Sequence, residues 1–282
     1  MKVKWIAWQN HRRTEELCSY LGIKPTVLDS NSLRIFKHPL FVLKTIREIY
    51  KGEIETLIVQ NPSIILTLVA CLLRRVRGYK LVVDTHNAGI QPEDDFLKKL
   101  DWLYRYFQRE ANLTVVTNET LAGIVKNNGG IPFVMPDRLP NPKSVQKETL
   151  KGRRNLVYIC TYGIDEPFIQ VLDAAKELPK DYVLYVTGNY NKAIGITERY
   201  KQENIVFTGY LDEDRYWRLL GSCDLVIDLT NRDNCLVCGA YEAVSVGTPL
   251  ILSSKLELMK YFYRGCVYTD NSLPSIIKAV HE

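Results

Sequence analysis

Residues 234–253 have the sequence NCLVCGAYEAVSVGTPLILS, which is typical of a loop, then a helix, then a strand. Gly239 lies where the loop enters the helix, so free backbone N–H groups are presented to an anion, as a diphosphate requires. Glu242, one turn further on, does not favour a phosphate but suits the two hydroxyl groups of a ribose. Residues 247–249 (Gly-Thr-Pro) end the helix before an apolar strand. The stretch therefore predicts a nucleotide site in an α/β protein.

The first half of the chain alternates apolar runs typical of strands with segments of helical periodicity. Strands are expected at 3–8, 26–29, 56–60, 80–84 and 113–117, and helices at 14–21, 40–50, 63–76 and 94–110. Such alternation predicts a parallel sheet with helices on both faces. Ligands of these sheets bind beyond the carboxyl ends of the strands.

A break in this pattern divides the chain. Residues 135–154 are rich in proline and then in charged residues, a composition suited to a linker. Beyond it, strands are expected at 156–160, 182–187, 204–208 and 225–229, and helices at 167–177 and 213–220. We therefore predict two domains, 1–140 and 155–282, joined by a linker at 141–154, with a ligand cleft between them.

Composition narrows the class of protein. The 282 residues are 46% hydrophobic and 24% charged, which is typical of an ordinary globular protein. There is no apolar run long enough to span a membrane and no signal peptide, so we expect a cytoplasmic protein. Seven cysteines without framework spacing fit a reducing compartment. The net charge of +5 suits nucleotide phosphates, nucleic acid or an anionic membrane equally well.

Several segments of the second half together resemble the glycosyltransferases of the GT-B fold, particularly glycosyltransferase family 4. They are Val-Thr-Gly-Asn at 186–189, residues 204–211, 216–220 and 224–229, and the Gly239/Glu242 segment. The resemblance implies two Rossmann-like domains facing each other across a cleft. It also implies transfer of a sugar from a nucleotide-sugar donor to a lipid-linked or saccharide acceptor, with retention and without metal or cofactor.

The resemblance assigns roles to residues of the second half. Glu242 would bind the ribose, and Asn234 stands where the family usually carries a glutamate that contacts the sugar hydroxyls. An amide still recognises hydroxyls but does not stabilise positive charge at the sugar. The expected donor-binding residues are Gly163, Gly188, Asn189, Lys192, Arg232, Cys238, Gly239, Ala240 and Glu242. A surface position for Glu242 and a plain polar turn at 188–192 are the alternatives.

The loop after the first strand of the second half departs from the family. Family members carry an arginine and a lysine there that clamp the diphosphate, whereas residues 161–167 are Thr-Tyr-Gly-Ile-Asp-Glu-Pro. We expect Asp165 and Glu166 to cap the helix that starts at Pro167. The phosphate charge would then be met by Arg232, ranked first, by Lys192 or Lys255, or by N–H groups around Gly239.

The first half offers an acceptor side. His86 follows the fourth strand and is the candidate for contacting the transferred sugar or the leaving phosphate, as the histidine at the comparable place in family 4 does. Its alternative is a histidine satisfied by local hydrogen bonds. The expected catalytic residues are thus His86 and Asn234. The acceptor-side candidates are Asn10, Arg12, Arg13 and Asn87. The two arginines equally fit a helix-entry surface.

Two further patterns have competing interpretations. Residues 66–77 and Lys80 form an apolar helix with a basic end, which fits either a peripheral contact with an anionic membrane or a core helix whose cations suit its dipole. Cys235 and Cys238 have the spacing of a metal or redox pair, but no second pair accompanies them, so no metal is expected.

Other functions compete with the glycosyltransferase interpretation. A non-catalytic GT-B subunit that binds a nucleotide or a partner subunit fits the missing cation clamp and Asn234. The chain shows no further acid/base cluster that an epimerase would need, and no glycine motif of a dehydrogenase follows any expected strand. No nucleic-acid partner is expected. In family members a further helical stretch follows the last strand, whereas this sequence ends at residues 276–282. We therefore expect a shortened C-terminal end relative to the family, from either a naturally short protein or a fragment.

Overall fold

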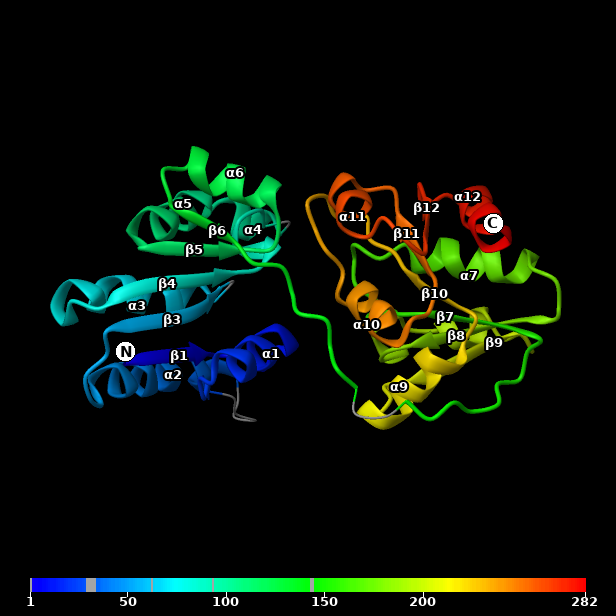
Figure 1. Cartoon of the computed structure of the whole chain (residues 1–282), viewed down its shortest axis with the longest axis horizontal. Helices are drawn as coiled ribbons and strands as arrows, with labels where there is room; N and C mark the ends of the chain where they lie inside the picture. Colours follow the sequence, from blue (N-terminus) through cyan, green and yellow to red (C-terminus); the bar gives the residue numbers. More distant parts are fainter. Residues whose placement is uncertain (1, 29–33, 62, 93, 143–144) are drawn as a thin grey trace. The chain divides into compact units, whose positions relative to one another are not determined.

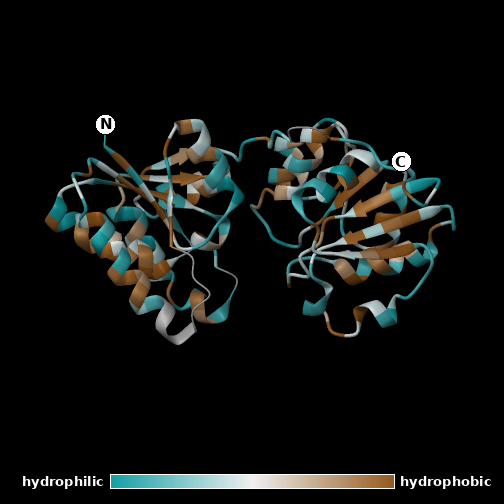
Figure 2. Cartoon of the chain, turned by 90° about the horizontal axis from the view of Figure 1, so that it is seen from below, coloured by the Kyte–Doolittle hydropathy of each residue, from teal (hydrophilic) through white to brown (hydrophobic). Residues whose placement is uncertain are grey.

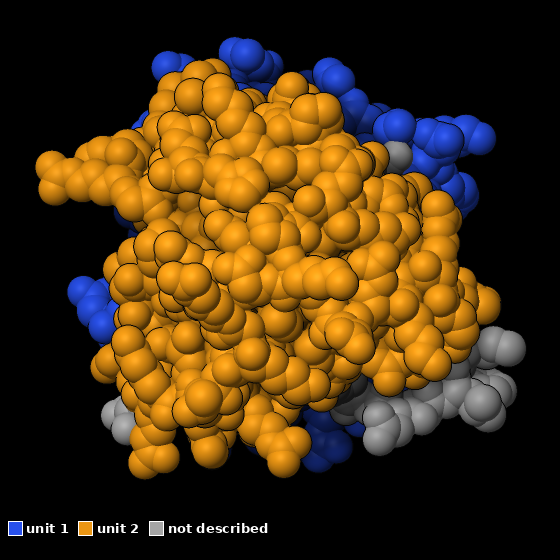
Figure 3. Space-filling view, turned by 90° about the vertical axis from the view of Figure 1, so that its right-hand side faces the viewer, with its two compact units in different colours: residues 1–138 blue, residues 139–282 orange. Residues whose placement is uncertain are grey.

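The computed structural model describes residues 2–28, 34–61, 63–92, 94–142 and 145–282. The chain divides into two compact units, residues 1–138 (unit 1) and 139–282 (unit 2), which are coloured separately in Figure 3. Each unit contains one six-stranded sheet whose strands are all parallel. The predicted class, two Rossmann-like α/β units, is confirmed.

Unit 1 has the strand order β2-β1-β3-β4-β5-β6. Figure 1 labels the part β1-β3-β4-β5-β6 of this order. Its strands are β1 (Val3–Ala7), β2 (Thr26–Val27), β3 (Thr56–Asn61), β4 (Lys80–Thr85), β5 (Leu113–Val116) and β6 (Pro132–Val134). Its helices are α1 (Arg12–Leu21), α2 (Arg34–Tyr50), α3 (Ile64–Arg77), α4 (Asp95–Lys98), α5 (Asp101–Glu110) and α6 (Glu119–Asn127). Helices α2, α3 and α5 pack on one core cluster with β1, β3 and β4, while α1 packs on a separate cluster with Trp5.

Unit 2 has the strand order β12-β11-β10-β7-β8-β9. Its strands are β7 (Arg154–Tyr158), β8 (Tyr182–Thr187), β9 (Ile205–Gly209), β10 (Leu225–Asp228), β11 (Leu250–Ser253) and β12 (Cys266–Thr269). Its helices are α7 (Phe168–Glu177), α8 (Ile196–Arg199), α9 (Glu213–Ser222), α10 (Cys238–Val246), α11 (Leu256–Tyr261) and α12 (Leu273–His281).

Alternating side chains of β7 explain the layers of unit 2. Leu156 and Tyr158 enter a core cluster with α7 and α12, whereas Val157 enters one with α9, α10 and α11. A central parallel strand is covered on both faces, so its residues are apolar without alternation. Figure 2 shows the result as hydrophobic strands lying inside helices of mixed hydropathy.

Two expected elements differ in the structure. The single helix predicted at 94–110 is broken into α4 and α5, because the N–H of Leu100 bonds to the carbonyl of Leu97 and the helical spacing is lost there. The helix predicted at 40–50 begins earlier, at Arg34, and includes Pro39. Helix α6 and strand β6 were not predicted, although Asn118 caps α6 with its side chain.

The proline-rich and charged segment predicted as a linker packs along unit 2 over part of its length. The side-chain hydroxyl of Ser222 accepts a hydrogen bond from Glu148 N at 2.8 Å, and the hydroxyl of Tyr185 accepts one from Lys151 N at 2.8 Å. Leu150 packs partly buried against the core of the same unit. Residues 148–151 are therefore fastened to unit 2.

Candidate functional site

The carboxyl edge of the unit 2 sheet brings the predicted donor residues together. Strand β7 lies between β8, which follows it in the chain, and β10, which returns on its other side. This reversal of strand order leaves a crevice beyond the strand ends, which is where ligands of open α/β sheets bind. Loops 159–167, 188–192 and 229–237 all leave the sheet at this edge.

Gly239 allows α10 to begin directly against the strand ends. A Cβ atom at Gly239 would lie 2.5 Å from Asp228 Oδ2 and 2.6 Å from Ile159 Cδ1. The helix follows Val237, which gives no side-chain cap. The N–H groups of Gly239 and Ala240 face the carboxyl of Asp228, so this helix start is directed at a negative group, as expected for an anion site.

Asp228, at the end of β10, is an acid that the sequence prediction missed. Asp228 as a whole residue is 8% exposed, and its Oδ2 has no hydrogen-bond partner among the described residues. The pKa of its carboxyl lies well above the usual value, first because burial disfavours the charge and then because Glu242 and Glu166 repel it. The backbone amides of Ala240 and Gly239 act in the opposite direction. The end of a strand before the Gly239 loop was the signal that could have identified Asp228.

Glu242 lies one turn into α10 and is partly exposed. Its Oε2 accepts a hydrogen bond from the hydroxyl of Tyr216, a residue of α9. The carboxylate is thus oriented by a neighbouring helix. Such a group, accessible and positioned, can accept hydrogen bonds from a pair of hydroxyl groups.

Glu166 does not cap a helix, contrary to the prediction. Helix α7 has Pro167 at its N-cap without a side-chain capping bond. The Glu166 carboxylate turns back instead onto the loop after β7 and bonds to the amides of Thr161 and Gly163. Asp165 does not cap α7 either; its carboxylate accepts a hydrogen bond from the hydroxyl of Thr230 at 3.1 Å.

The loop after β8 lies against the loop after β7. Gly188 has a φ of +86°, and a Cβ there would approach the carbonyl oxygen of Cys160 to 1.9 Å, so only glycine fits. Asn189 accepts a hydrogen bond from Asn191 N, and Lys192 Nζ donates to the carbonyl of Thr161 at 3.1 Å. Lys192 therefore places a cation beside the loop that lacks the expected clamp.

The other cations considered for the phosphate lie near carboxylates. Arg232 Nε is 3.9 Å from Asp165 Oδ2, and Lys255 Nζ is 2.8 Å from Asp233 Oδ1. Asn234 adopts a φ of +56° in the same loop. Cys235 and the exposed Cys238 are not joined in a disulfide, and within the described ranges no three metal-ligating side chains gather in a way that could hold a metal ion.

The carboxyl edge of the unit 1 sheet holds a pair of histidines. His11 follows β1 and His86 follows β4, and their ring centroids are 4.2 Å apart. Gln60 Nε2, from the end of β3, lies 3.4 Å from His86 Nε2. Burial is the main cause that lowers the pKa of each histidine to about 4, so both rings are neutral at pH 7. His11 and Gln60 were missed: Gln60 stands near the end of β3, and His11 is the N-cap residue of α1, whose Nδ1 accepts a hydrogen bond from Arg13 N at 3.2 Å.

Arg13 is not available to a ligand. Its side chain is fully buried, with Nε 3.0 Å from Asp84 Oδ1, and it also bonds to Asp137 and to the carbonyl of Met135. Two carboxylates compensate one guanidinium inside the unit, which is how a buried charge is tolerated. We therefore assign Arg13 a structural role in place of the acceptor-side role suggested by its sequence position.

The remaining acceptor-side candidates differ in exposure. Asn10 is exposed, Arg12 is partly exposed, and Asn87 is 7% exposed at the short helical turn that follows His86. Asn10 and Arg12 flank His11, so they belong to the same edge as His86.

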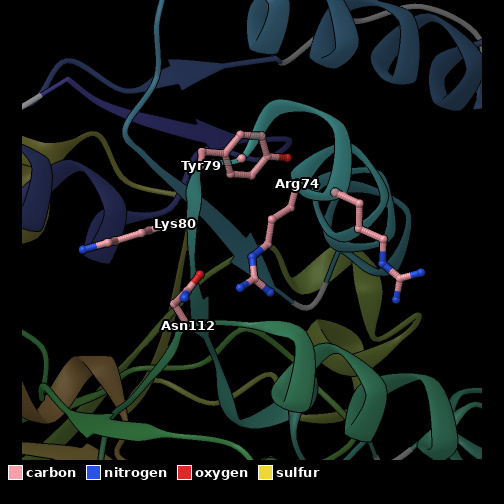
Figure 4. Close-up of a pocket in the computed structure, with 6 residues that line it drawn as sticks. Arg74, Tyr79, Lys80 and Asn112 are labelled. Carbon is pink, nitrogen blue, oxygen red and sulfur yellow. The ribbon is translucent and has the colours of Figure 1, made fainter.

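A separate pocket of about 330 Å³ lies at the opposite, amino edge of the unit 1 sheet (Figure 4). It is formed where α3 ends and β4 and β5 begin, and it is lined by Arg74, Arg75, Gly78, Tyr79, Lys80 and Asn112. Arg74 donates to the carbonyl of Glu110, and Arg75 lies 3.3 Å from the Glu110 carboxylate. The pocket is basic and distinct from the histidine pair.

Known proteins with similar structures share this architecture. Sucrose-phosphate synthase from Thermosynechococcus elongatus has a TM-score of 0.79 at 13% identity, covering 100% of this chain and 89% of its own. Anabaena HepE in complex with UDP has a TM-score of 0.73 at 14% identity, with 100% and 89% covered. UDP-GlcNAc 2-epimerase from Methanocaldococcus jannaschii has a TM-score of 0.65 at 11% identity, with 100% and 92% covered.

These likenesses show the fold, which is the GT-B fold of glycosyltransferases and UDP-N-acetylglucosamine 2-epimerases. A comparison with models of protein families gives no match. A comparison with curated protein sequences gives none either. Membership of glycosyltransferase family 4 therefore stays a prediction from the sequence.

Proposed function

We propose that this chain is a glycosyltransferase that transfers a sugar from a nucleotide-sugar donor to a hydroxyl group of a lipid-linked or saccharide acceptor. The observation that carries the proposal is the edge of unit 2 at which the start of α10 and Glu242 lie together beyond β7 and β10. HepE, a protein of similar fold, has been solved in complex with UDP, which supports a nucleotide donor.

Each part of this edge has a role in the proposal. The amides of Cys238, Gly239 and Ala240 bind the diphosphate, and Glu242 binds the ribose hydroxyls. Lys192 and Arg232 supply positive charge. Asn234 contacts the hydroxyls of the transferred sugar. The reaction proposed requires no cofactor and no metal.

In this proposal the neutral His86 ring contacts the transferred sugar or the leaving phosphate. A histidine with a pKa of about 4 can donate and accept hydrogen bonds at pH 7 without carrying charge. We propose retention of anomeric configuration, with attack from the face that the diphosphate leaves and proton transfer to the departing phosphate. Proton NMR of the first product formed would identify its anomeric configuration.

A thermal-shift panel tests the proposed function. UDP, GDP, ADP, CMP and their sugar conjugates are added to the whole chain, because a ligand that binds only the folded state raises the melting temperature. We expect one nucleotide family to give a rise that shrinks in Glu242→Ala, and the matching sugar conjugate to be turned over with an acceptor. No rise with any nucleotide would favour a non-catalytic subunit that binds a partner chain, and conversion of the sugar without transfer would favour an epimerase.

We further propose that α3 contacts an anionic membrane peripherally. Among the described residues, no helix is long and apolar enough to span a bilayer. Phe41 and Leu66 are buried and belong to the core, whereas Ile65, Leu72 and Val76 are exposed on one stripe of α3. The basic pocket lies at the end of the same helix. An apolar stripe beside cations suits the surface of an anionic bilayer.

Vesicle co-sedimentation tests the membrane contact. We expect binding to vesicles that contain phosphatidylglycerol and little binding to pure phosphatidylcholine. The double variant Arg75→Glu, Lys80→Glu should lose most of this binding, because about 1 kcal/mol is contributed by each cation near such a surface. Lys201→Glu with Lys180→Glu, exposed in unit 2, is the charge-matched control. Equal binding of both double variants would contradict the proposal.

A further inference from the structure

The loop after β7 encloses a carboxylate of its own chain. Glu166 Oε2 accepts hydrogen bonds from Thr161 N at 2.9 Å and from Gly163 N at 3.0 Å. Oε1 accepts from the hydroxyl of Thr161 at 2.8 Å and from its amide at 3.1 Å. The thiol of Cys160 lies 3.4 Å from Oε2. Both oxygens of Glu166 are therefore held by donors of one short loop.

The backbone of this loop has the form of an anion-binding nest. Tyr162, between the two donating amides, has a φ of +57°, a conformation uncommon for a residue with a side chain. The amide of Tyr162 itself bonds to Cys160 Sγ at 3.3 Å, and the amides on either side of it converge on the carboxylate. Concave groups of amides of this kind bind anions, and phosphate groups are frequent occupants. The loop is thus built around a negative charge, and in this structure that charge belongs to Glu166.

The nest lies at the same edge as the start of α10. Lys192 Nζ donates to the carbonyl of Thr161, the residue whose amide and hydroxyl hold Glu166. Asp228, whose carboxyl adjoins Gly239, is close enough to Glu166 for the two charges to act on each other. The nest and Lys192 therefore lie at the same edge as the start of α10, where the diphosphate is proposed to bind.

We propose that Glu166 is an internal competitor for the phosphate: the nest binds a phosphoryl group of the donor only after the Glu166 carboxylate has left it. This inference rests on the proposed function, because it takes the ligand to be a nucleoside diphosphate. Two anions cannot share the nest, since like charges repel strongly at such distances. The displacement is confined to the side chain, because the neighbouring Asp165 is anchored through its carbonyl to Asn231 N at 2.6 Å and through its carboxylate to Thr230.

Calorimetric titration of UDP, uridine and inorganic pyrophosphate into the whole chain tests this competition. The variant Glu166→Gln removes the charge and one acceptor oxygen, so it occupies the nest less well. We expect it to bind UDP and pyrophosphate about tenfold more tightly than the natural chain does, with uridine unchanged. Glu166→Asp keeps the charge but is shorter by one methylene, and we expect a smaller gain. Glu203→Gln, an exposed change in the same unit, controls for net charge.

The outcomes separate this inference from the proposed function. If uridine and UDP bind but Glu166→Gln leaves the UDP affinity unchanged or weaker, the competition is overturned and the nucleotide site stands. If pyrophosphate alone binds, and more tightly to Glu166→Gln, the competition stands and the nucleotide donor is wrong. If all three probes bind no variant, both are overturned. Melting temperatures without ligand establish that each variant is folded.

Discussion

At the scale of single residues, Gly188 decides whether the loops of the unit 2 edge can meet. Its amide donates a hydrogen bond to the carbonyl of Gly209, the last residue of β9, and its φ is +86°. The space that a Cβ would need is occupied by the carbonyl of Cys160. The glycine therefore sets the distance between the loop that carries Lys192 and the loop that carries Glu166.

Gly188→Ala should destabilise the chain by roughly 3 kcal/mol or more, because steric overlap with backbone adds to the strain of positive φ. Gly195→Ala is the matched control, since Gly195 has a φ of +76° but open space around its would-be Cβ. There we expect about 1 kcal/mol, the cost of the left-handed backbone alone. Urea unfolding of both variants checks the difference, and equal losses would show that the Cys160 contact is unimportant.

Asp228 is a residue whose protonation couples stability to pH. Its folded-state pKa is raised above the unfolded value of about 3.8. The stability that protonated Asp228 contributes is therefore complete below pH 3.8 and is lost as pH rises toward the raised folded pKa. Asparagine keeps the shape of the neutral acid. We therefore expect Asp228→Asn to raise the melting temperature at pH 7.5 by a few degrees and to change it little at pH 4.

Asp173→Asn is the control for this pH dependence. The pKa of Asp173 is lowered, with hydrogen bonds from Tyr200 and Lys176 overcoming its burial, so its contribution is present above pH 3.8 and is lost on acidification. Its variant should lose stability at pH 7.5, the opposite direction. A loss of stability at pH 7.5 in Asp228→Asn would mean that its charged form is the native one.

At the scale of elements, three strand ends of unit 1 bring the two histidines together, and their charge state links acid stability to this edge. Each pKa is lowered from 6.5 to about 4. The folded state therefore binds fewer protons, and its stability is complete above pH 6.5 and is lost as pH falls through 4. The charged groups facing the pair are Asp84, Asp137 and Arg13.

The double variant His11→Asn, His86→Gln should flatten the loss of stability between pH 6.5 and 4. Each histidine accounts for roughly 3 kcal/mol over this range, as an order of magnitude. Chemical unfolding at several pH values measures the effect. Gln202→Asn, an exposed change of a side chain that does not titrate, is the control and should leave the slope unchanged. An unchanged slope in the double variant would contradict the neutral, buried state of the pair.

At the scale of the whole molecule, the sequence predicted the two-unit architecture because alternating apolar runs and helical segments leave few topologies. Gly22, for example, ends α1 with a φ of +66° as its position suggests. The break at Leu100 could not be predicted, since nothing local interrupts the helical pattern there. Whether the site residues act as assigned is not tested by the fold, and their roles stay predictions.

The backbone of the candidate site could be predicted at positions where only glycine fits. Gly188 and Gly239 stand where close packing excludes a side chain, and such glycines are visible in the sequence. The hydrogen-bond partners of Glu166 and Arg13 could not be predicted, because they depend on which groups the folded chain places beside these side chains. A sequence gives the charge of a side chain, and tertiary contacts decide whether a ligand or another residue meets it.

The central claim is that Glu242 binds the ribose of a nucleotide at the start of α10, and a mutant cycle on affinity tests it most directly. UDP and its 2′,3′-dideoxy analogue are titrated into the natural chain and into Glu242→Gln. We expect the variant to lose about tenfold to hundredfold in affinity for UDP and almost nothing for the analogue, because the carboxylate's partners are absent from it. An equal loss for both nucleotides, or none for either, would contradict the account.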